Sequence, residues 1–427
     1  MRRLLVCVEI GGVLKQVGHI DGGHPSDAVF RYDDAYLSES CAAPVSVNLP
    51  LQTDAFSAEK TRNFFEGLLP EGFTRRSVAK WMHADETDYL SILAGLGSEC
   101  LGAVCILMDG AERPVPGYER ISDREVAAIA REGATTSAQI VTKAHLSLTG
   151  ASGKVGLYFD DESGTWYLPK GTAPSTHIVK QSHVRMSGIV ANEQLSLLTA
   201  RELGMEVPDS FIINLGEGRD EEVLFATRRF DRKCSKSGDI IDGLHAPLRL
   251  HQEDFAQALG MSSVQKYEDR PDGYMRKMFS LLRTKSADPV QDQLRLWDLI
   301  VFNFLIGNAD AHLKNVSLLY DESLKGVRLA PFYDILSTSV YDSGTRDMAV
   351  YIGEKCSLDE ITPDDFRAAA DEAGLGQRMA MRRFDLLCGK FEKALHTAAD
   401  TLSTHGFVMA HDLEEQILAT GGCRRIL

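Results

Sequence analysis

The spacing of hydrophobic and polar residues changes character near residue 231. Before that position, short apolar runs bounded by glycine, proline and polar residues predict strands. After it, apolar residues recur three and four positions apart, which indicates amphipathic helices. The clearest case is residues 289–306, where this spacing runs from Val290 to Phe304 and Gly307 ends it. We therefore expect an α+β protein with a β-rich first half and a helical second half.

The first 108 residues are expected to form one β-rich unit. Its expected elements are strands at residues 4–10, 28–30, 32–36 and 102–108 and helices at residues 57–68 and 72–82. Residues 109–117 contain two prolines and two glycines, which predicts a linker.

Residues 118–231 predict an antiparallel sheet with one main helix, which is the outline of the small lobe of a protein kinase. Ser122 and Glu125 form an S-x-x-E capping box, which predicts the start of a short helix. The expected strands are residues 155–159, 165–168, 176–181, 210–214 and 223–229, and the main helix is residues 190–203. Beyond residue 231, helices are expected at residues 252–259, 289–306, 363–372, 378–402 and 412–419, with a hairpin of residues 316–320 and 327–330.

Composition places the chain among ordinary globular proteins. It has 427 residues, 44% of them hydrophobic and 25% charged, which is enough for about two or three domains. The net charge of −15 argues against a dominant nucleic-acid-binding surface, because proteins that grip DNA alone usually present a basic face.

The cysteines and the N-terminus predict a cytoplasmic protein. None of the eight cysteines is spaced as C-x-x-C, which argues against a cysteine-based zinc site and fits reduced thiols in a cytosol. No apolar run is long enough for a membrane span. The apolar run at the N-terminus is cut by Glu9 and is too short for a signal peptide.

The strongest chemical signal follows the helix at residues 289–306. Asp310 and Asn315 lie five positions apart, and Asp334 follows beyond the expected hairpin. Phosphoryl transfer from ATP needs such a set: one carboxylate accepts the proton of the attacking hydroxyl, while an amide and a second carboxylate hold Mg²⁺. The D-x-x-x-x-N spacing is that of a kinase catalytic loop. A polar turn after a helix is the competing interpretation.

A phosphate-binding side is expected upstream. The loop at residues 149–154 has two glycines and ends in Lys154, so its backbone N–H groups could approach phosphate oxygens, although a simple turn between strands would look the same. Lys180 has the place of the strand lysine that pairs with the α- and β-phosphates, and Glu193 on the next helix could pair with it. Residues 228–231 would join the two lobes. The order of these elements is that of a kinase.

Together these motifs resemble the HipA family, the serine/threonine kinase toxins of bacterial HipBA toxin–antitoxin modules. The resemblance covers nearly the whole chain. It is carried by Ser147 to Lys154, Thr176 to Lys180, Arg229 to Arg232, His251 to Phe255, Gly307 to Asn315, Tyr333 and Asp334, and, in the N-terminal part, Pro44 to Pro50 and Leu69 to Gly72.

The resemblance implies a protein-kinase-like two-lobe fold and dependence on ATP and Mg²⁺. The implied domains are an N-terminal HipA-type subdomain at residues 1–108, a small β lobe at residues 109–231 and an all-helical C-terminal lobe at residues 232–427.

The resemblance also assigns roles to individual residues. Asp310 would be the catalytic base, Asn315 and Asp334 would bind Mg²⁺, and Ser147 would be an autophosphorylation site that silences the enzyme. This chain departs from the family at Ser152 and Gly153, where loop contacts to phosphate would differ. The residues expected to contact ATP are Thr149, Gly150, Ala151, Ser152, Gly153, Lys154, Lys180, Arg228, Arg229, Phe230, His312, Leu313, Lys314, Asn315 and Tyr333.

The resemblance further implies partners. The family's targets are translation components, notably aminoacyl-tRNA synthetases such as glutamyl-tRNA synthetase. Its antitoxin, HipB, is a helix-turn-helix DNA-binding dimer with which the toxin represses its own operon. Two alternatives stay open at this point: a catalytically weak co-repressor that acts only through the antitoxin and DNA, and a small-molecule phosphotransferase. A metal hydrolase built on Asp310 and His312 is weaker, because we find no further His/Asp pair with suitable spacing.

Overall fold

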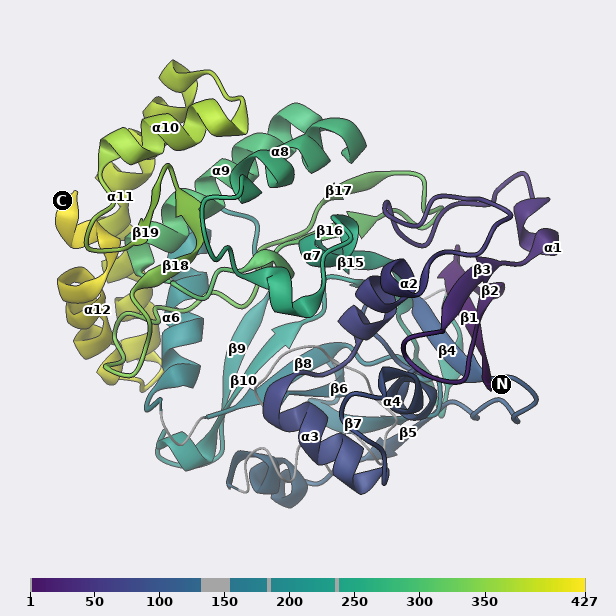
Figure 1. The fold of residues 1–427 in the computed structure, drawn as a ribbon. Helices are drawn as coiled ribbons and strands as arrows, with labels where there is room; N and C mark the ends of the chain where they lie inside the picture. Colours follow the sequence, from purple (N-terminus) through teal and green to yellow (C-terminus); the bar gives the residue numbers. More distant parts are fainter. Residues whose placement is uncertain (1, 132–153, 183–185, 235–237, 427) are drawn as a thin grey trace. The chain divides into compact units, whose positions relative to one another are not determined.

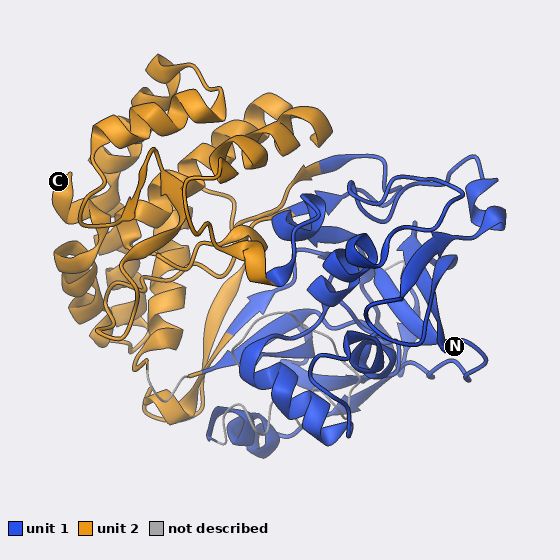
Figure 2. Cartoon of the chain, viewed as in Figure 1, with its two compact units in different colours: residues 1–181, 226–263, 318–327 blue, residues 182–225, 264–317, 328–427 orange. Residues whose placement is uncertain are grey.

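The computed structural model describes residues 2–131, 154–182, 186–234 and 238–426. The chain forms two compact units (Figure 2): unit 1 comprises residues 1–181, 226–263 and 318–327, and unit 2 comprises residues 182–225, 264–317 and 328–427. Helices and strands are mixed in the chain, as the sequence predicts for an α+β fold. The domain boundaries at residues 108 and 231 stay predictions.

The first sheet has the strand order β3-β2-β1-β4 and belongs to unit 1. Its strands are β1 (Arg2–Ile10), β2 (Val13–Gly22), β3 (Val29–Tyr32) and β4 (Val104–Met108), and its helices are α1 (Asp34–Leu37), α2 (Ala58–Phe65), α3 (Gly72–Trp81) and α4 (Tyr89–Leu96). The strand expected at residues 32–36 is wrong beyond Tyr32. The chain turns there instead, because Tyr36 is buried and its hydroxyl donates to the carbonyl of Ala43 at 2.7 Å.

The second sheet has six strands in the order β5-β7-β6-β8-β10-β9. The hairpin expected at residues 155–168 is confirmed, and the Ser122–Glu125 capping box is formed in both directions. The strands are β5 (Gly117–Arg120), β6 (Lys154–Asp160), β7 (Thr165–Lys170), β8 (His177–Gln181), β9 (Ser210–Asn214) and β10 (Val223–Arg228), and the main helix is α6 (Ile189–Glu202).

Short strands follow residue 231 before the helices begin. They are β11 (Arg232–Lys233), β12 (Ile240–Ile241), β13 (Leu244–His245), β14 (Leu248–Arg249) and β15 (Gln252–Asp254). The helix expected at residues 252–259 is wrong in its first turn. Residues 252–254 pair in a sheet of order β15-β16-β17, and only α7 (Phe255–Ala258) is helical, starting at a capping box of Asp254 and Gln257.

Unit 2 is mainly helical. Helix α11 lies along α6 and also packs against α9, α10 and α12 (Figure 1). Phe366 is the centre of its aromatic core, 4.6 Å from Phe384, 5.2 Å from Phe304 and 6.0 Å from Trp297 between ring centroids. Among the described residues, no helix combines the length and apolar character that a membrane crossing requires. Besides α6 and β9, its elements are α8 (Tyr274–Lys285), α9 (Pro289–Ile306), β18 (Asp347–Ile352), β19 (Lys355–Ser357), α10 (Pro363–Ala373), α11 (Gln377–Thr404) and α12 (Met409–Thr420). The strands β16 (Ser317–Tyr320) and β17 (Val327–Leu329) lie where the chain passes between the units, with residues 318–327 in unit 1.

A buried carboxylate links two of the family-type motifs within unit 1. Glu253 accepts hydrogen bonds from the Ser46 hydroxyl at 2.5 Å, from the Val47 N–H at 2.9 Å and from the Tyr320 hydroxyl. Next to it, His251 bonds through Nε2 to the carbonyl of Val45 at 2.7 Å. Burial raises the pKa of Glu253 to about 7, although the three donors favour the ionised form.

The raised pKa of Glu253 predicts a pH-dependent stability. The folded state holds the proton more tightly than the unfolded state, where the pKa is near its ordinary value of 4.5. The contribution of the protonated Glu253 to the free energy of unfolding is complete below pH 4.5 and is lost as the pH rises through about 7. At roughly 1.4 kcal/mol per pKa unit, this contribution amounts to about 3 kcal/mol. In urea unfolding between about pH 5 and 8, we expect Glu253→Gln to lose less stability than the unsubstituted protein. The exposed Glu392→Gln variant is the control, and equal pH slopes in all three proteins would contradict the prediction.

Candidate active site

The loop that carries Asp310 and Asn315 directly follows helix α9. The helix begins at Asp288, whose side chain accepts from the N–H of Gln291 at 3.3 Å, with Pro289 in the first turn. It ends at Gly307, which has a left-handed φ of 75°. An L-residue rarely adopts this conformation, and an added Cβ would clash with the Ser339 hydroxyl. The sequence therefore ends the helix two residues before the candidate catalytic loop.

The loop closes on itself through the backbone of Asp310. The Asp310 carbonyl accepts from the His312 N–H at 2.8 Å and from the Asn315 Nδ2 at 2.9 Å. Residues 312–314 are buried, whereas Asp310 is exposed. Because the amide nitrogen of Asn315 is used inside the loop, its oxygen, the atom type that Mg²⁺ prefers, is the end left for a ligand. The structure thus places Asp310 and Asn315 on one tight turn.

Tyr267 is a site residue that sequence reasoning missed. Its hydroxyl donates to Oδ1 of Asp310 at 2.6 Å, and its ring lies 5.1 Å from that of His312. This bond fixes one oxygen of the carboxylate. No spacing in the sequence points to Tyr267, which lies 43 residues before Asp310.

The segment carrying Asp334 is fastened to the same loop at two points. Upstream, the Tyr333 hydroxyl donates to the carbonyl of Lys314 at 2.9 Å and lies 2.6 Å from the Ser317 hydroxyl. Downstream, the N–H groups of residues 338 and 339 donate to the carbonyl of Gly307 at 3.0 and 3.1 Å. Asp334 therefore lies on a segment held beside the loop that ends in Asn315.

Asp334 itself has a left-handed backbone, with φ at 57°. Such a conformation is uncommon for a residue other than glycine, although aspartate tolerates it better than most. Backbone strain of this kind concentrates at functional sites. It sets the direction of the Asp334 side chain through the backbone.

Helix α6 is tied to the Asp334 segment by a buried asparagine. Asn192 donates through Nδ2 to the carbonyl of Ser337 at 2.8 Å and accepts from the Ser337 N–H at 2.9 Å. Its side chain is fully buried. The neighbouring Glu193 is also buried, and its expected pairing with Lys180 stays a prediction. Asn192, like Tyr267, carries no motif that would have identified it.

The expected phosphate side lies in unit 1. Lys154 on β6 and Lys180 on β8 are direct cross-strand partners, so their side chains leave the sheet on the same face. Lys180 is only 8% exposed. The two expected phosphate-binding lysines therefore come from neighbouring positions of one sheet face. The other expected loop residues, Thr149, Gly150, Ala151, Ser152 and Gly153, and the expected autophosphorylation site Ser147, lie outside the described residues.

The side chains expected near adenine have other partners. Arg228 bonds Asp161 at 2.8 Å, and Phe230 is partly exposed. Arg229 is buried, with Nη2 2.7 Å from Asp231 and Nη1 3.3 Å from Glu99. The guanidinium of Arg229 therefore belongs to the core of unit 1, and its backbone N–H donates to the carbonyl of Thr176 at 2.9 Å.

Four charged groups form this buried cluster. Burial disfavours an ionised Glu99, but Arg232 and Arg229 outweigh that effect and lower the pKa of its carboxyl. Asp231 is held ionised in the same way, with a lowered pKa. Arg232 Nη2 lies 3.0 Å from each oxygen of Glu99. The cluster joins residue 99 to residues 229–232.

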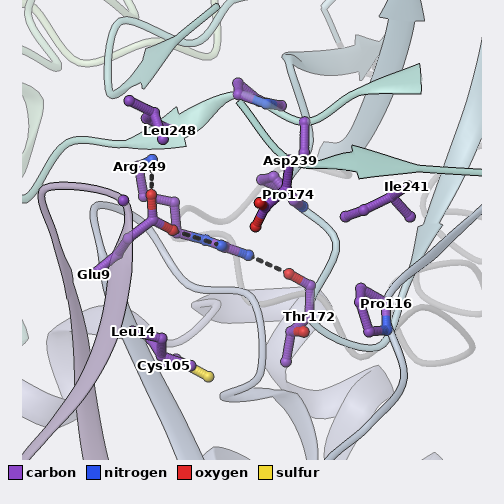
Figure 3. Close-up of a pocket in the computed structure, with 13 residues that line it drawn as sticks. Glu9, Leu14, Cys105, Pro116, Thr172, Pro174, Asp239, Ile241, Leu248 and Arg249 are labelled. Carbon is purple, nitrogen blue, oxygen red and sulfur yellow. Dashed lines mark hydrogen bonds and ion pairs between the residues drawn. The ribbon is translucent and has the colours of Figure 1, made fainter. Parts of the chain in front are cut away.

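A cavity of about 180 Å³ in unit 1 is separate from these residues (Figure 3). Arg249 crosses it, bonded to Glu9 at 3.1 Å and to the carbonyl of Thr172 at 2.5 Å. None of the expected site residues lines it. The cavity adds nothing to the kinase-type chemistry.

Comparisons with known proteins agree with this arrangement. Residues 12–107 match the model of the HipA N-terminal domain, and residues 146–395 match that of the HipA-like C-terminal domain. A putative kinase of Sinorhizobium fredii is 33% identical over 390 residues, covering 89% of this chain and 88% of its own. A serine/threonine-protein kinase toxin HipA of Shewanella oneidensis is 26% identical, covering 82% and 80%.

A solved structure shows the same fold. It is that of Shewanella oneidensis HipA with HipB and its operator DNA, with a TM-score of 0.79 and 23% identity. The match covers 99% of this chain and 97% of the HipA chain. The match confirms the expected α+β fold as that of HipA. The all-helical lobe expected at residues 232–427 is wrong, because the strands β11 to β19 lie in this range.

The end of helix α9 provides a stability prediction. We expect Gly307→Ala to lower the free energy of unfolding by about 2–4 kcal/mol. An alanine would be strained at the left-handed φ of this position, and its Cβ would also clash with the Ser339 hydroxyl. Gly389→Ala is the matched control: it lies exposed inside α11 with open space around it, and the change should stabilise by about 0.5–1 kcal/mol. Chemical denaturation measures both. A Gly307→Ala protein as stable as the original would show that the helix end is not constrained.

Proposed function

The chain belongs to the HipA family, and we propose that it is an ATP- and Mg²⁺-dependent serine/threonine protein kinase that inhibits growth as a toxin. The observation that carries the proposal is the joint anchoring of Asp310, Asn315 and the Asp334 segment. One loop presents the first two, and hydrogen bonds from Tyr333 and residues 338–339 hold the third beside it. A base and two hard oxygen ligands are what phosphoryl transfer requires.

Each residue then has a chemical task. Asp310 accepts the proton of the attacking serine or threonine hydroxyl, and the Tyr267 hydroxyl orients the carboxylate by donating to its Oδ1. Asn315 and Asp334 bind Mg²⁺, which neutralises charge on the phosphates when bound. Lys154 and Lys180 contribute positive charge to the phosphates from adjacent strands.

Partners and substrate extend the proposal. A relative is named a HipA kinase toxin, and the similar solved structure contains HipB and operator DNA. We infer that this chain binds a HipB-type helix-turn-helix antitoxin and reaches operator DNA mainly through it, which its net charge of −15 favours. The substrate is a translation component of the aminoacyl-tRNA synthetase class, such as glutamyl-tRNA synthetase. The protein acts in the cytoplasm.

Phosphate transfer tests the kinase activity. Purified protein with labelled ATP and Mg²⁺ should phosphorylate proteins in a cell lysate, and Asp310→Asn should reduce the rate by about 10²–10⁴-fold while ATP still binds. Asp334→Asn should abolish the Mg²⁺ dependence of ATP binding. Asp385→Asn, an exposed aspartate on α11, is the matched control and should leave transfer unchanged.

Growth measurements complete that test. Induced expression of the unsubstituted chain and of Asp385→Asn should stop growth, and Asp310→Asn should not. Full transfer by Asp310→Asn would remove the proposed role of that carboxylate. No transfer by the unsubstituted protein, with toxicity only beside the antitoxin gene, would instead favour the co-repressor.

Self-inactivation is tested at Ser147. We expect mass spectrometry after incubation with Mg-ATP to find phosphate on Ser147, and activity to fall as it accumulates. A dianionic group beside the phosphate loop repels the phosphates of ATP. Ser147→Ala should stay active under the same incubation, whereas Ser163→Ala, in the exposed β6–β7 turn, should be inactivated like the original. Unphosphorylated Ser147 in inactivated protein would refute this switch.

A further inference from the structure

We propose that helices α11 and α12 carry a second metal site, for a divalent transition-metal ion such as Zn²⁺, built from His396, Asp400 and His411. The three residues each offer one ligand atom, and these atoms all lie within 4.8 Å of one another. The cluster belongs to unit 2 and shares no residue with the candidate active site. The inference is independent of the proposed kinase activity.

The two helices bring the ligands together through their periodicity. His396 and Asp400 are four positions apart on α11, and His411 and Glu414 are three apart on α12, so each pair lies on one face of its helix. The short turn at residues 405–408 brings α12 back against α11 (Figure 1). The faces that meet therefore each contribute one imidazole and one carboxylate.

Glu414 orients both imidazoles. Its Oε1 lies 3.0 Å from Nδ1 of His396, and its Oε2 lies 3.1 Å from Nδ1 of His411. Glu414 is 9% exposed, so one buried carboxylate accepts from both rings. A ring that donates through Nδ1 keeps the lone pair on Nε2, which is the tautomer that binds metal. Carboxylates that orient histidine ligands in this way are a regular feature of zinc sites.

The Nε2 atoms converge on Asp400. Nε2 of His396 lies 3.6 Å from Oδ2 of Asp400, and Nε2 of His411 lies 3.6 Å from its Oδ1. These separations are too long for good hydrogen bonds. They are close to the roughly 3.3 Å that separates two ligands bonded at about 2.0–2.1 Å to one tetrahedral ion. A small rotation of the side chains would place all three on a single metal.

The donor set selects the kind of ion. Imidazole nitrogen favours zinc, cobalt, nickel or copper, whereas Mg²⁺ and Ca²⁺ prefer oxygen ligands. Three protein ligands leave a fourth position for water, which suits the exposed face where His396 and Asp400 lie. An ion bound there would fasten α12 to α11 and would stabilise the folded state in proportion to its affinity.

Zinc titration of the full chain tests the site. Tag-free, EDTA-treated protein is titrated with Zn²⁺ against a chromogenic chelator in excess Mg²⁺, which occupies hard oxygen sites. We expect one Zn²⁺ per chain, with affinity lowered at least about 10-fold in His396→Gln and in His411→Gln. His405→Gln is the matched control, because His405 bonds the carbonyl of Thr401 outside the cluster. Asp334→Asn should also bind as the original does.

Two further readouts separate a metal site from a folding defect. Glu414→Gln keeps all three ligands but leaves one acceptor oxygen where the two imidazoles had one each, and should weaken Zn²⁺ binding by roughly 10–100-fold. Zn²⁺ should raise the Tm of the original and of His405→Gln but not of His411→Gln, with circular dichroism in EDTA confirming that each variant is folded. Equal Zn²⁺ affinity in the original and both ligand variants would overturn the proposal.

Cobalt identifies the ligands without any substitution. Co²⁺ bound by imidazole and carboxylate should show visible absorption of a four- or five-coordinate ion and no thiolate charge-transfer band. A thiolate band would place the metal on one of the chain's free cysteines and would refute the site. Absence of any bound Co²⁺ or Zn²⁺ would refute it equally.

Discussion

The carbonyl oxygen of Gly307 is the contact on which the candidate active site depends. Helix α9 has to stop there, and the left-handed turn exposes that oxygen to the N–H groups of residues 338 and 339. The Thr338 hydroxyl bonds the same carbonyl at 3.1 Å and accepts from the N–H of Ala309 at 2.8 Å. The downstream end of the Asp334 segment is thereby fixed by backbone bonds to Gly307, and its upstream end is held by the Tyr333 hydroxyl. The hydrogen bonds at the Gly307 carbonyl thus position the loop with Asp310 and the segment with Asp334 next to each other.

Unit 1 relies on a different device, the burial of balanced charges. Glu99 and Asp231 compensate Arg229 and Arg232, and all four side chains are at most 2% exposed. Removing one partner of such a cluster leaves a buried uncompensated charge, at a cost of about 3–5 kcal/mol. The gain from the complete cluster is smaller, because desolvation offsets most of the attraction. The cluster therefore specifies the arrangement of the segments more than it stabilises them.

Local patterns predicted much of the fold, and the residues of the candidate site stay predictions. The helix at residues 289–306 was predicted to the residue, because a 3.6-residue period, a proline at the start and a glycine at the end all agree there. The helix predicted at residues 252–259 was wrong in its first turn, because residues 252–254 pair as strand β15 with β16, some 65 residues away. Tyr267 and Asn192 could not be found, since their roles come from tertiary contacts. His396 and His411 were passed over because each helix supplies a single histidine, and only the tertiary packing of α11 against α12 brings the two together.

The buried cluster at Glu99 bears on how this chain can be divided. Two family models match separate segments of the chain, residues 12–107 and 146–395, as they would in a protein built from interchangeable modules. Yet Glu99, one of the two carboxylates that neutralise Arg229 and Arg232, comes from the first segment, whereas Asp231 and both guanidiniums come from the second. Expressed alone, the second segment would keep both buried arginines with Asp231 but without Glu99, and so with one positive charge in excess. A hybrid that takes one segment from a relative therefore has to keep the charge at residue 99 matched to the charges at residues 229–232.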